Sequence, residues 1–362
     1  MSQFNTTRRQ ILKSAAAVGA SSLIARPALA KTWDVKFTLA WLAQGTSLFP
    51  FVGKEKDFFS KRGINLEISR GFGSLAAAQA IASGQFDYGI VISAPLVLMV
   101  AKGLPLKGLG TIDYDAMMGV GVLADSPIRK PSDLIGKKVA TVATSAESPF
   151  FAAYAKLAQI DASKVEMMNV DAKVVERTME SGQTDAMTGI ASSSLPVLLS
   201  SNKPARWMLY SSVGIPTYGN ALVGSTKAVE SDPELAAAMS DAVFESLAYT
   251  IANPEEAADI FFKVVPEAGL NPGAREFIRI GMGLHRYGIA KPEAIEHGLG
   301  WGDPKVYDAI TDLVMSYLAG PDSKRPDVSS WYSNKFAGNI KLATKDWTQI
   351  AGGLGEFQKL LS

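Results

Sequence analysis

Two stretches of this chain, distant from each other in sequence, follow the same plan. Residues 82–95 read ASGQFDYGIVISAP, and residues 180–196 read ESGQTDAMTGIASSSLP. In each, Ser-Gly-Gln-x-Asp ends a predicted helix, an apolar strand follows, and a serine-containing turn leads into a helix with a proline. A chance match of four residues is the alternative, but the similar surroundings favour a repeated supersecondary unit. The sequence therefore predicts two halves with one architecture.

Apolar strands alternate with helices around both stretches. The expected strands are residues 35–40, 64–68, 87–92, 106–112, 137–142, 165–170 and 185–190, and the expected helices are residues 47–62, 75–83, 95–101, 149–159, 173–181 and 195–201. This alternation is typical of an α/β fold with a mostly parallel sheet covered by helices. The later part of the chain is helical, with strong helix starts at residues 231–234 and 253–256.

Residues 1–30 have the features of a twin-arginine export signal. Arg8 and Arg9 precede a weakly apolar stretch, and residues 28–30 supply the small side chains that a signal peptidase accepts. The stretch is too short to span a bilayer, and an ordinary helix beginning is the alternative. Cleavage would leave 36 − 4 = 32 basic and 35 acidic residues, a formal charge of about −3. We therefore expect a periplasmic protein without the basic excess that nucleic acid or an anionic membrane requires.

The content of metal-binding and nucleophilic side chains is low. The chain has no cysteine and only two histidines, His285 and His297. Disulfides, thiolate metal sites and a cysteine nucleophile are therefore excluded, and a centre of several histidines is not expected. We predict neither a metal nor a cofactor.

Five turns that follow predicted strands are rich in small polar residues. They are residues 41–47, 70–74, 93–94, 144–148 and 191–193. Ligands of open α/β sheets bind where such turns lead from strands into helices, because backbone N–H groups are free there. Each turn alone could simply cap a helix. The candidate ligand-binding residues are Trp41, Gln44, Ser47, Gly73, Ser74, Ser93, Ala94, Ser145, Ala146, Glu147, Ser148, Ser192 and Tyr218.

Three of these candidates have two possible roles. Trp41 ends the first predicted strand, where it could stack on a flat ligand or pack in the core. Tyr218 is expected to form the opposite wall of the cleft, with core packing as its alternative. Glu147 is the one acid in the five turns. It could favour a helix N-terminus or accept hydrogen bonds from a ligand amine or amidine.

Together these features resemble the periplasmic substrate-binding proteins of nitrate/sulfonate/taurine-type ABC importers and their relatives that bind thiamine-pyrimidine precursors. The resemblance rests on Trp41 and on the segments GKEKDFFSKRGINLEI, ASGQFDYGI, PSDLIGKKVAT, ESGQTDAM and AYTIANPEEAADIF, and it covers about residues 33–265. It implies a two-lobed fold with a hinge, in which the chain crosses between the lobes near residues 119–124 and 220–225.

The resemblance also implies a division of the chain. Lobe one would comprise residues 31–121 and 224–362 and would include a helical C-terminal extension, and lobe two would comprise residues 122–223. Residues 270–362 have no assigned counterpart and could cap the first lobe.

The function implied is that of an exported, monomeric receptor that captures a small polar or heteroaromatic ligand and delivers it to an ABC permease. A flat nitrogen heterocycle fits two aromatic walls and Glu147, whereas a sulfonate, nitrate or carboxylate fits the serine turns. An exported enzyme of the same fold is the alternative, and an acid pair such as Asp113 with Glu147 could serve it. The fungal pyrimidine-making enzymes of this fold depend on cysteine- and histidine-rich segments, which this chain lacks.

Overall fold

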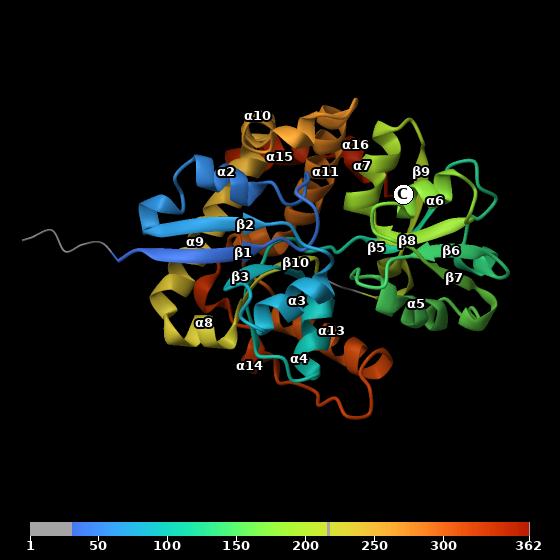
Figure 1. The fold of residues 1–362 in the computed structure, drawn as a ribbon, viewed down its shortest axis with the longest axis horizontal. Helices are drawn as coiled ribbons and strands as arrows, with labels where there is room; N and C mark the ends of the chain where they lie inside the picture. Colours follow the sequence, from blue (N-terminus) through green and yellow to red (C-terminus); the bar gives the residue numbers. More distant parts are fainter. Residues whose placement is uncertain (1–30, 216–217, 362) are drawn as a thin grey trace, which may run out of the picture. The chain divides into compact units, whose positions relative to one another are not determined.

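Two five-stranded sheets form the framework of the computed structural model, which describes residues 31–215 and 218–361 (Figure 1). In spatial order, the first sheet consists of β2 (Ile64–Ser69), β1 (Trp33–Thr38), β3 (Tyr88–Ile92), β10 (Asn220–Ser225) and β4 (Leu106–Thr111). The second consists of β7 (Glu166–Asn169), β6 (Lys138–Thr141), β8 (Ala186–Ile190), β5 (Met118–Leu123) and β9 (Ala205–Leu209). The two orders correspond strand for strand, which confirms the predicted repeat. The predicted export signal lies outside the described residues.

Each sheet is mostly parallel, as predicted, because four of its five strands run in one direction and one strand is antiparallel to them. Strand β1 pairs in parallel with β2 and β3, whereas β10 is antiparallel to both β3 and β4. The second sheet repeats this arrangement, with β6 parallel to its two neighbours and β5 antiparallel to β8 and β9. The antiparallel strands β5 and β10 are the ones that follow a strand of the other sheet. They enter from the opposite direction and therefore run against their neighbours.

The chain passes between the sheets twice, through residues 112–117 and back through residues 210–219. We call the part built on the first sheet lobe one and the part built on the second sheet lobe two. The expected lobe boundaries, after residues 121 and 223, fall inside β5 and β10, a few residues past the crossings. Apolar character identifies a strand but not the sheet that it joins, which explains this offset.

Helices cover both sheets. Lobe one has α2 (Phe49–Glu55), α3 (Ser74–Ala82) and α4 (Ser93–Ala101), and lobe two has α5 (Phe151–Leu157), α6 (Val175–Glu180) and α7 (Ala191–Ser200). Strand β3 is buried along its whole length, as expected of a strand covered on both faces. The helix expected over residues 47–62 ends earlier, because Asp57 has a positive φ of 62° and a short 3₁₀ turn follows. Among the described residues, no helix combines the length and the apolar character needed to cross a membrane.

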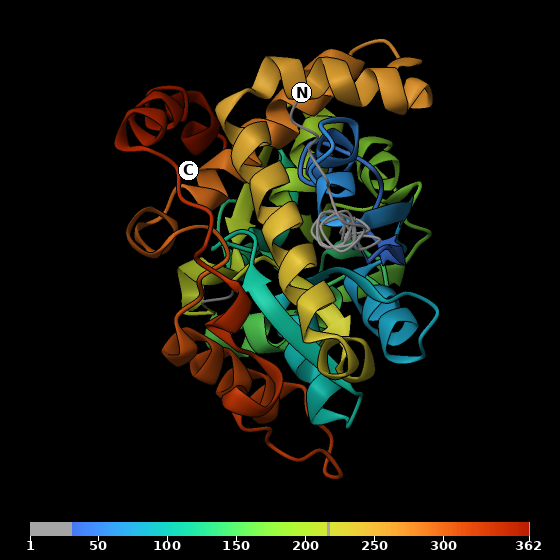
Figure 2. The ribbon, with the colours of Figure 1, turned by 90° about the vertical axis from the view of Figure 1, so that its left-hand side faces the viewer.

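The C-terminal part of the chain contacts both lobes. Its helices are α8 (Thr226–Ser231), α9 (Pro233–Ala252), α10 (Pro254–Val264), α11 (Ala274–Ile289), α12 (Pro292–His297), α13 (Pro304–Tyr317), α14 (Val328–Trp331), α15 (Thr344–Gly352) and α16 (Gly355–Lys359). Figure 2 shows the long helix α9, in gold, crossing the side turned to the viewer. Helix α13 packs on α4 of lobe one, whereas α11 packs on α7 of lobe two. The C-terminal region is therefore more than a cap on lobe one.

Helix α11 contains three interior glycines, although glycine weakens a helix by roughly 0.5–1 kcal/mol relative to alanine. A Cβ at one of them, Gly283, would lie 2.1 Å from the Phe357 ring of α16. Gly283→Ala should therefore displace α16 and lower the free energy of unfolding by about 1–3 kcal/mol, measured by urea denaturation. Gly355→Ala is the control, since a Cβ there meets nothing within 4 Å. Equal denaturation midpoints for the two variants would show that α16 is not held against this face.

Candidate functional site

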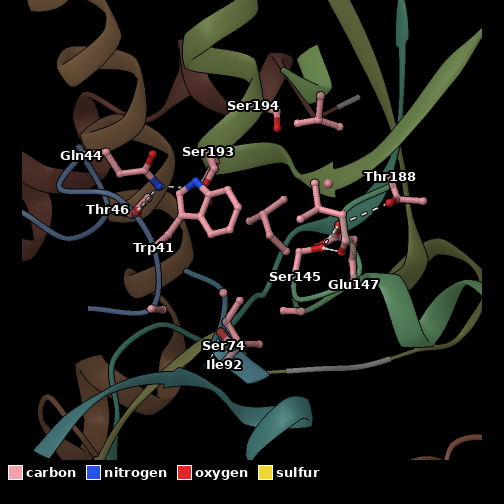
Figure 3. Close-up of a pocket in the computed structure, with 18 of the residues that line it drawn as sticks. Trp41, Gln44, Thr46, Ser74, Ile92, Ser145, Glu147, Thr188, Ser193 and Ser194 are labelled. Atoms are coloured by element: carbon pink, nitrogen blue, oxygen red, sulfur yellow. Dashed lines mark hydrogen bonds between the residues drawn. The ribbon is translucent and has the colours of Figure 1, made fainter. Parts of the chain in front are cut away.

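A cavity lies where the carboxyl ends of strands from the two lobes meet (Figure 3). It encloses about 770 Å³ of space free of protein atoms, its open mouth included. Lobe one and β10 contribute Ala40, Trp41, Gln44, Thr46, Ser47, Gly73, Ser74, Ile90, Ile92 and Asn220, and lobe two contributes Val142, Ser145, Ala146, Glu147, Val175, Glu176, Met187, Thr188, Gly189, Ile190, Ser192, Ser193 and Ser194. The volume suits a small organic ligand.

Most of the predicted site residues line this cavity. They are Trp41, Gln44, Ser47, Gly73, Ser74, Ser145, Ala146, Glu147 and Ser192. Ser93, Ala94 and Ser148 do not line it. Ser93 is fully buried and donates a hydrogen bond to the Gly219 carbonyl oxygen at 3.0 Å, and Ala94 is buried in the first turn of α4. Ser148 accepts a hydrogen bond from Thr141. These three residues hold the turns in place.

Tyr218 does not form the opposite wall of the cleft. Its ring packs edge-on against Tyr114 and Tyr307, with centroids 5.4 and 5.3 Å apart. Its hydroxyl donates to Glu293 at 3.2 Å and accepts from the backbone N–H of Asp303 at 3.3 Å. Tyr218 is thus a core residue beneath the C-terminal helices, whose position over it could not be inferred from its sequence neighbours.

Trp41 follows β1 in a loop that the neighbouring turn holds in place. The backbone N–H of Gly71 donates to the Trp41 carbonyl oxygen at 2.8 Å, and that of Gly73 donates to Ala40 at 3.0 Å. A Cβ at Gly71 would lie 2.1 Å from the Leu39 carbonyl oxygen, so this close approach requires glycine. In Figure 3 the indole of Trp41 projects into the cavity. It is half-buried and also packs against an apolar cluster that lobe two and the C-terminal helices form, so this side chain lines the cavity and packs in a core.

The first turn of α7 forms another wall. Gln44 Nε2 from lobe one donates to Ser193 Oγ at 2.7 Å and to Thr46 Oγ1 at 3.1 Å. No side chain caps the N-terminus of α7 or of α3. The N–H groups of a helix's first turn have no partner within the helix, so these two ends can donate to polar ligand atoms.

Glu147 is a buried carboxyl group that faces the cavity. Its side chain is 2% exposed, and its Oε1 atom accepts from Ser145 Oγ and from Thr188 Oγ1, the latter at 3.3 Å (Figure 3). Its Oε2 atom is buried and has no hydrogen-bond partner among the described residues. Burial raises the pKa of Glu147, and the hydrogen bonds from Ser145 and Thr188 act in the opposite direction. The Oε2 atom of this carboxyl group can therefore still accept a hydrogen bond.

A second acid, Glu176, lines the same cavity. Burial raises the pKa of Glu176, and Ser194 Oγ donates to its Oε1 atom at 2.8 Å, which acts in the opposite direction. No lysine, arginine or histidine belongs to the set of lining residues. Arg70, the one arginine of the five predicted turns, lies instead over the ring of Phe72. The side-chain charges of the cavity therefore favour a neutral or cationic ligand over an anion.

The remaining ionisable groups do not assemble a catalytic pair in the cavity. Asp113 does not line it, and its Oδ2 atom accepts from Asn220 Nδ2 at 2.8 Å. His285 is buried beside Asp113, and the His297 ring packs in a tilted arrangement on Trp301 at a centroid distance of 4.0 Å. Over residues 31–215 and 218–361, no group of three or more histidine, aspartate and glutamate side chains is placed to hold a metal ion.

Sequence analysis missed several lining residues for identifiable reasons. Glu176 lies in a segment predicted only as a helix, and Thr188 lies inside a buried strand. Asn220 begins β10, a segment that was expected only as a crossing between the lobes. The serine run after β8 did contain a usable signal, because Ser193 and Ser194 continue the turn from which only Ser192 was chosen.

Comparison with known proteins agrees with this architecture. A family model described as "NMT1/THI5 like" matches residues 46–257. The formylaminopyrimidine-binding protein of Halalkalibacterium halodurans is 24% identical over 236 residues, which cover 65% of this chain and 71% of that protein. The 4-amino-5-hydroxymethyl-2-methylpyrimidine phosphate synthase of Uromyces fabae is 28% identical over 155 residues, or 42% of this chain and 46% of that enzyme.

A solved structure gives the same fold. The alkanesulfonate-binding protein SsuA from Xanthomonas axonopodis pv. citri, bound to MOPS, superposes with a TM-score of 0.63 at 16% identity. The match covers 83% of this chain and 98% of SsuA. The chain thus has the two-lobed periplasmic-binding-protein fold and belongs to the NMT1/THI5-like family.

Proposed function

We propose that this protein is an exported receptor that binds a small molecule between its lobes and delivers it to an ABC import permease. The cavity at the junction of the lobes supports this proposal, because lobe movement can close both walls around a ligand. The predicted twin-arginine signal and the periplasmic location belong to the same proposal. So do the permease of the inner membrane as partner and the monomeric state.

The ligand class that we propose is a flat nitrogen heterocycle with N–H donors. The observation that carries this proposal is the buried Oε2 atom of Glu147, for which residues 31–215 and 218–361 supply no hydrogen-bond partner. A ligand amine or amidine would supply the missing hydrogen bond, and the indole of Trp41 would stack on the ring. The relative named for formylaminopyrimidine supports this class. The sulfonate class, suggested by SsuA, fits less well because two carboxyl groups and no basic side chain line the cavity.

The receptor function is favoured over an enzyme by the side chains of the cavity. Within the part of the chain that the structure describes, neither histidine nor lysine lines the cavity, so its serines have no such side chain beside them to act as a general base. The similarity to the fungal synthase covers less than half of either chain.

Recovery of the natural ligand distinguishes the two functions. The purified protein is incubated with a metabolite pool, separated from it by gel filtration, and extracted for mass spectrometry. A receptor returns an unaltered metabolite in a stoichiometric amount, whereas an enzyme depletes one metabolite and produces another. Recovery of an altered metabolite would contradict the proposal.

Trp41→Ala is expected to weaken binding of the recovered ligand by about 1–3 kcal/mol, because it removes the ring that stacks on the ligand. Trp41→Phe should retain much of the affinity, since an aromatic face remains. Isothermal titration calorimetry measures both. If the affinity of Trp41→Ala equals that of the wild type, Trp41 is a core residue and not a wall of the site.

A further inference from the structure

Helix α11 is attached to the first crossing segment. The backbone N–H of Tyr114 donates to the Gly288 carbonyl oxygen at 2.9 Å. One turn earlier in α11, His285 Nε2 lies 3.3 Å from Asp113 Oδ2, and both side chains are buried. Asp113 also holds the end of the second crossing. Its carbonyl oxygen accepts from the backbone N–H of Gly219 at 2.9 Å, and its Oδ1 and Oδ2 atoms accept from the backbone and side chain of the next residue, Asn220, at 3.2 and 2.8 Å. Both crossings and α11 therefore meet at Asp113.

The same helix is packed against lobe two. Ile280 and Leu284 of α11 share one apolar cluster with Leu195 and Leu198 of α7, and all four are buried. Gly281 faces Pro196 of α7, since a Cβ there would lie 3.7 Å from the proline ring. Separation of α7 from α11 would expose several large apolar side chains to water, which the hydrophobic effect strongly opposes. Separation of these two helices is therefore energetically unfavourable.

At a different edge of the cavity, a hydrogen bond joins the two lobes. Thr144 Oγ1 of lobe two donates to the Phe72 carbonyl oxygen of lobe one at 2.9 Å. Gly73 approaches the same residue so closely that a Cβ would lie 2.1 Å from the Thr144 carbonyl oxygen. The Phe72 side chain is 62% exposed, so most of its apolar surface is in contact with solvent. A hydrogen bond of this kind contributes only about 1 kcal/mol net.

We propose that α11 is the third element of the hinge and that the lobes part at the Phe72–Thr144 edge while α7 and α11 remain packed. The Gln44–Ser193 hydrogen bond lies on the α11 side, because the neighbouring Gly45 contacts Gly281 and Met282. That bond is therefore retained on opening. The ligand enters between the turns before α3 and α5, and the C-terminal extension supplies the axis. The inference rests on the proposed receptor function, since a receptor must open.

The natural absence of cysteine allows a direct test. Nitroxide labels are placed on one double variant, Phe72→Cys with Ala143→Cys, across the entry edge. They are placed on a second, Ser201→Cys with Asn271→Cys, across the α7–α11 contact. All four positions are exposed, so the labels should not disturb folding. Bound small molecules are removed by unfolding in guanidinium and refolding, and pulsed electron paramagnetic resonance gives the distance distributions.

The expected result differs between the two pairs. The entry-edge pair should show a second, longer distance in the ligand-free protein, and the α7–α11 pair should show one narrow distance. Thr144→Ala, added to the first pair, should raise the ratio of long to short distances about fivefold, as loss of about 1 kcal/mol predicts. Ser200→Ala is the matched control, since this hydroxyl donates only within its own helix, and should change neither distribution.

Two outcomes would overturn the proposal. One is a longer distance at the α7–α11 pair, and the other is a single, identical distance at the entry edge with and without Thr144. Both measurements use the protein without ligand. A failure of this hinge arrangement is therefore distinct from a failure of the receptor function, which ligand recovery tests.

Discussion

Glu147→Gln is expected to weaken ligand binding by about 2–3 kcal/mol, the effect of losing a charge-assisted hydrogen bond in a buried site. The substitution keeps the shape of the side chain. However, it replaces one acceptor oxygen by an NH₂ group, which cannot accept from a ligand N–H. Glu176→Gln serves as the control, because that side chain is already engaged by Ser194. Calorimetry with the recovered ligand measures the affinity of both variants. If the two substitutions weaken binding equally, Glu147 has no special role in the site.

The same substitution should stabilise the ligand-free protein. Burial raises the pKa of Glu147 above its unfolded value, so the native state binds this proton more tightly than the unfolded chain does. The contribution of this proton to the free energy of unfolding is fully present below the pKa that Glu147 has in the unfolded chain. It is lost as the pH rises through the pKa that Glu147 has in the native protein. Glu147→Gln removes this loss. At pH 8 the free energy of unfolding of the variant should therefore exceed that of the wild type by about 1–2 kcal/mol.

Urea denaturation at several pH values tests this expectation. The difference between Glu147→Gln and wild type should shrink as the pH falls toward 5, because the native carboxyl group takes up its proton. A difference that stays constant with pH, or a variant less stable than the wild type at pH 8, would contradict the electrostatic description of this group. A buried site that trades stability for binding is a common feature of functional positions.

Gly45→Ala is expected to lower the free energy of unfolding by about 3 kcal/mol, near the upper end for overpacking in a core. The added Cβ would lie 2.5 Å from the Met282 backbone nitrogen and 2.7 Å from the Gly281 carbonyl carbon. These are backbone atoms of α11, so only a shift of the helix or of the 41–47 loop can relieve the contact. Ligand affinity should fall as well, because Gln44 and Trp41 lie in this loop.

Guanidinium denaturation measures the effect. Gly352→Ala, at the end of α15, is a matched control because a Cβ there meets nothing within 4 Å. It should change stability by less than about 1 kcal/mol, or increase it slightly through helix propensity. If Gly45→Ala leaves the midpoint unchanged, the loop and α11 are not in close contact, and the hinge arrangement loses one of its supports.

Local patterns predicted much of the framework. The SGQ-x-D repeat and the strand–helix alternation anticipated two sheets of one architecture, and most of the residues predicted from the small polar turns line the cavity. These features are local, since a helix start or a strand end depends mainly on nearby residues. The choice between core and ligand wall for Trp41 had no local answer, and its side chain packs against an apolar cluster while it also lines the cavity.

Contacts between distant segments escaped sequence analysis. The exchange of β5 and β10 between the sheets depends on pairing partners far along the chain, and so does the burial of Tyr218 under α12 and α13. The contact of α11 with α7 joins segments whose helical character was predicted but whose proximity was not. The three glycines of α11 were the available signal, because interior glycines often mark a close approach.

Calorimetric titration of the wild type and Glu147→Gln with a panel of aminopyrimidines, alkanesulfonates and nitrate, at one neutral pH, tests the central claim most directly. Our description predicts that an aminopyrimidine binds the wild type and that Glu147→Gln loses most of this affinity. Binding of a sulfonate or of nitrate, with equal affinity in both proteins, would contradict it.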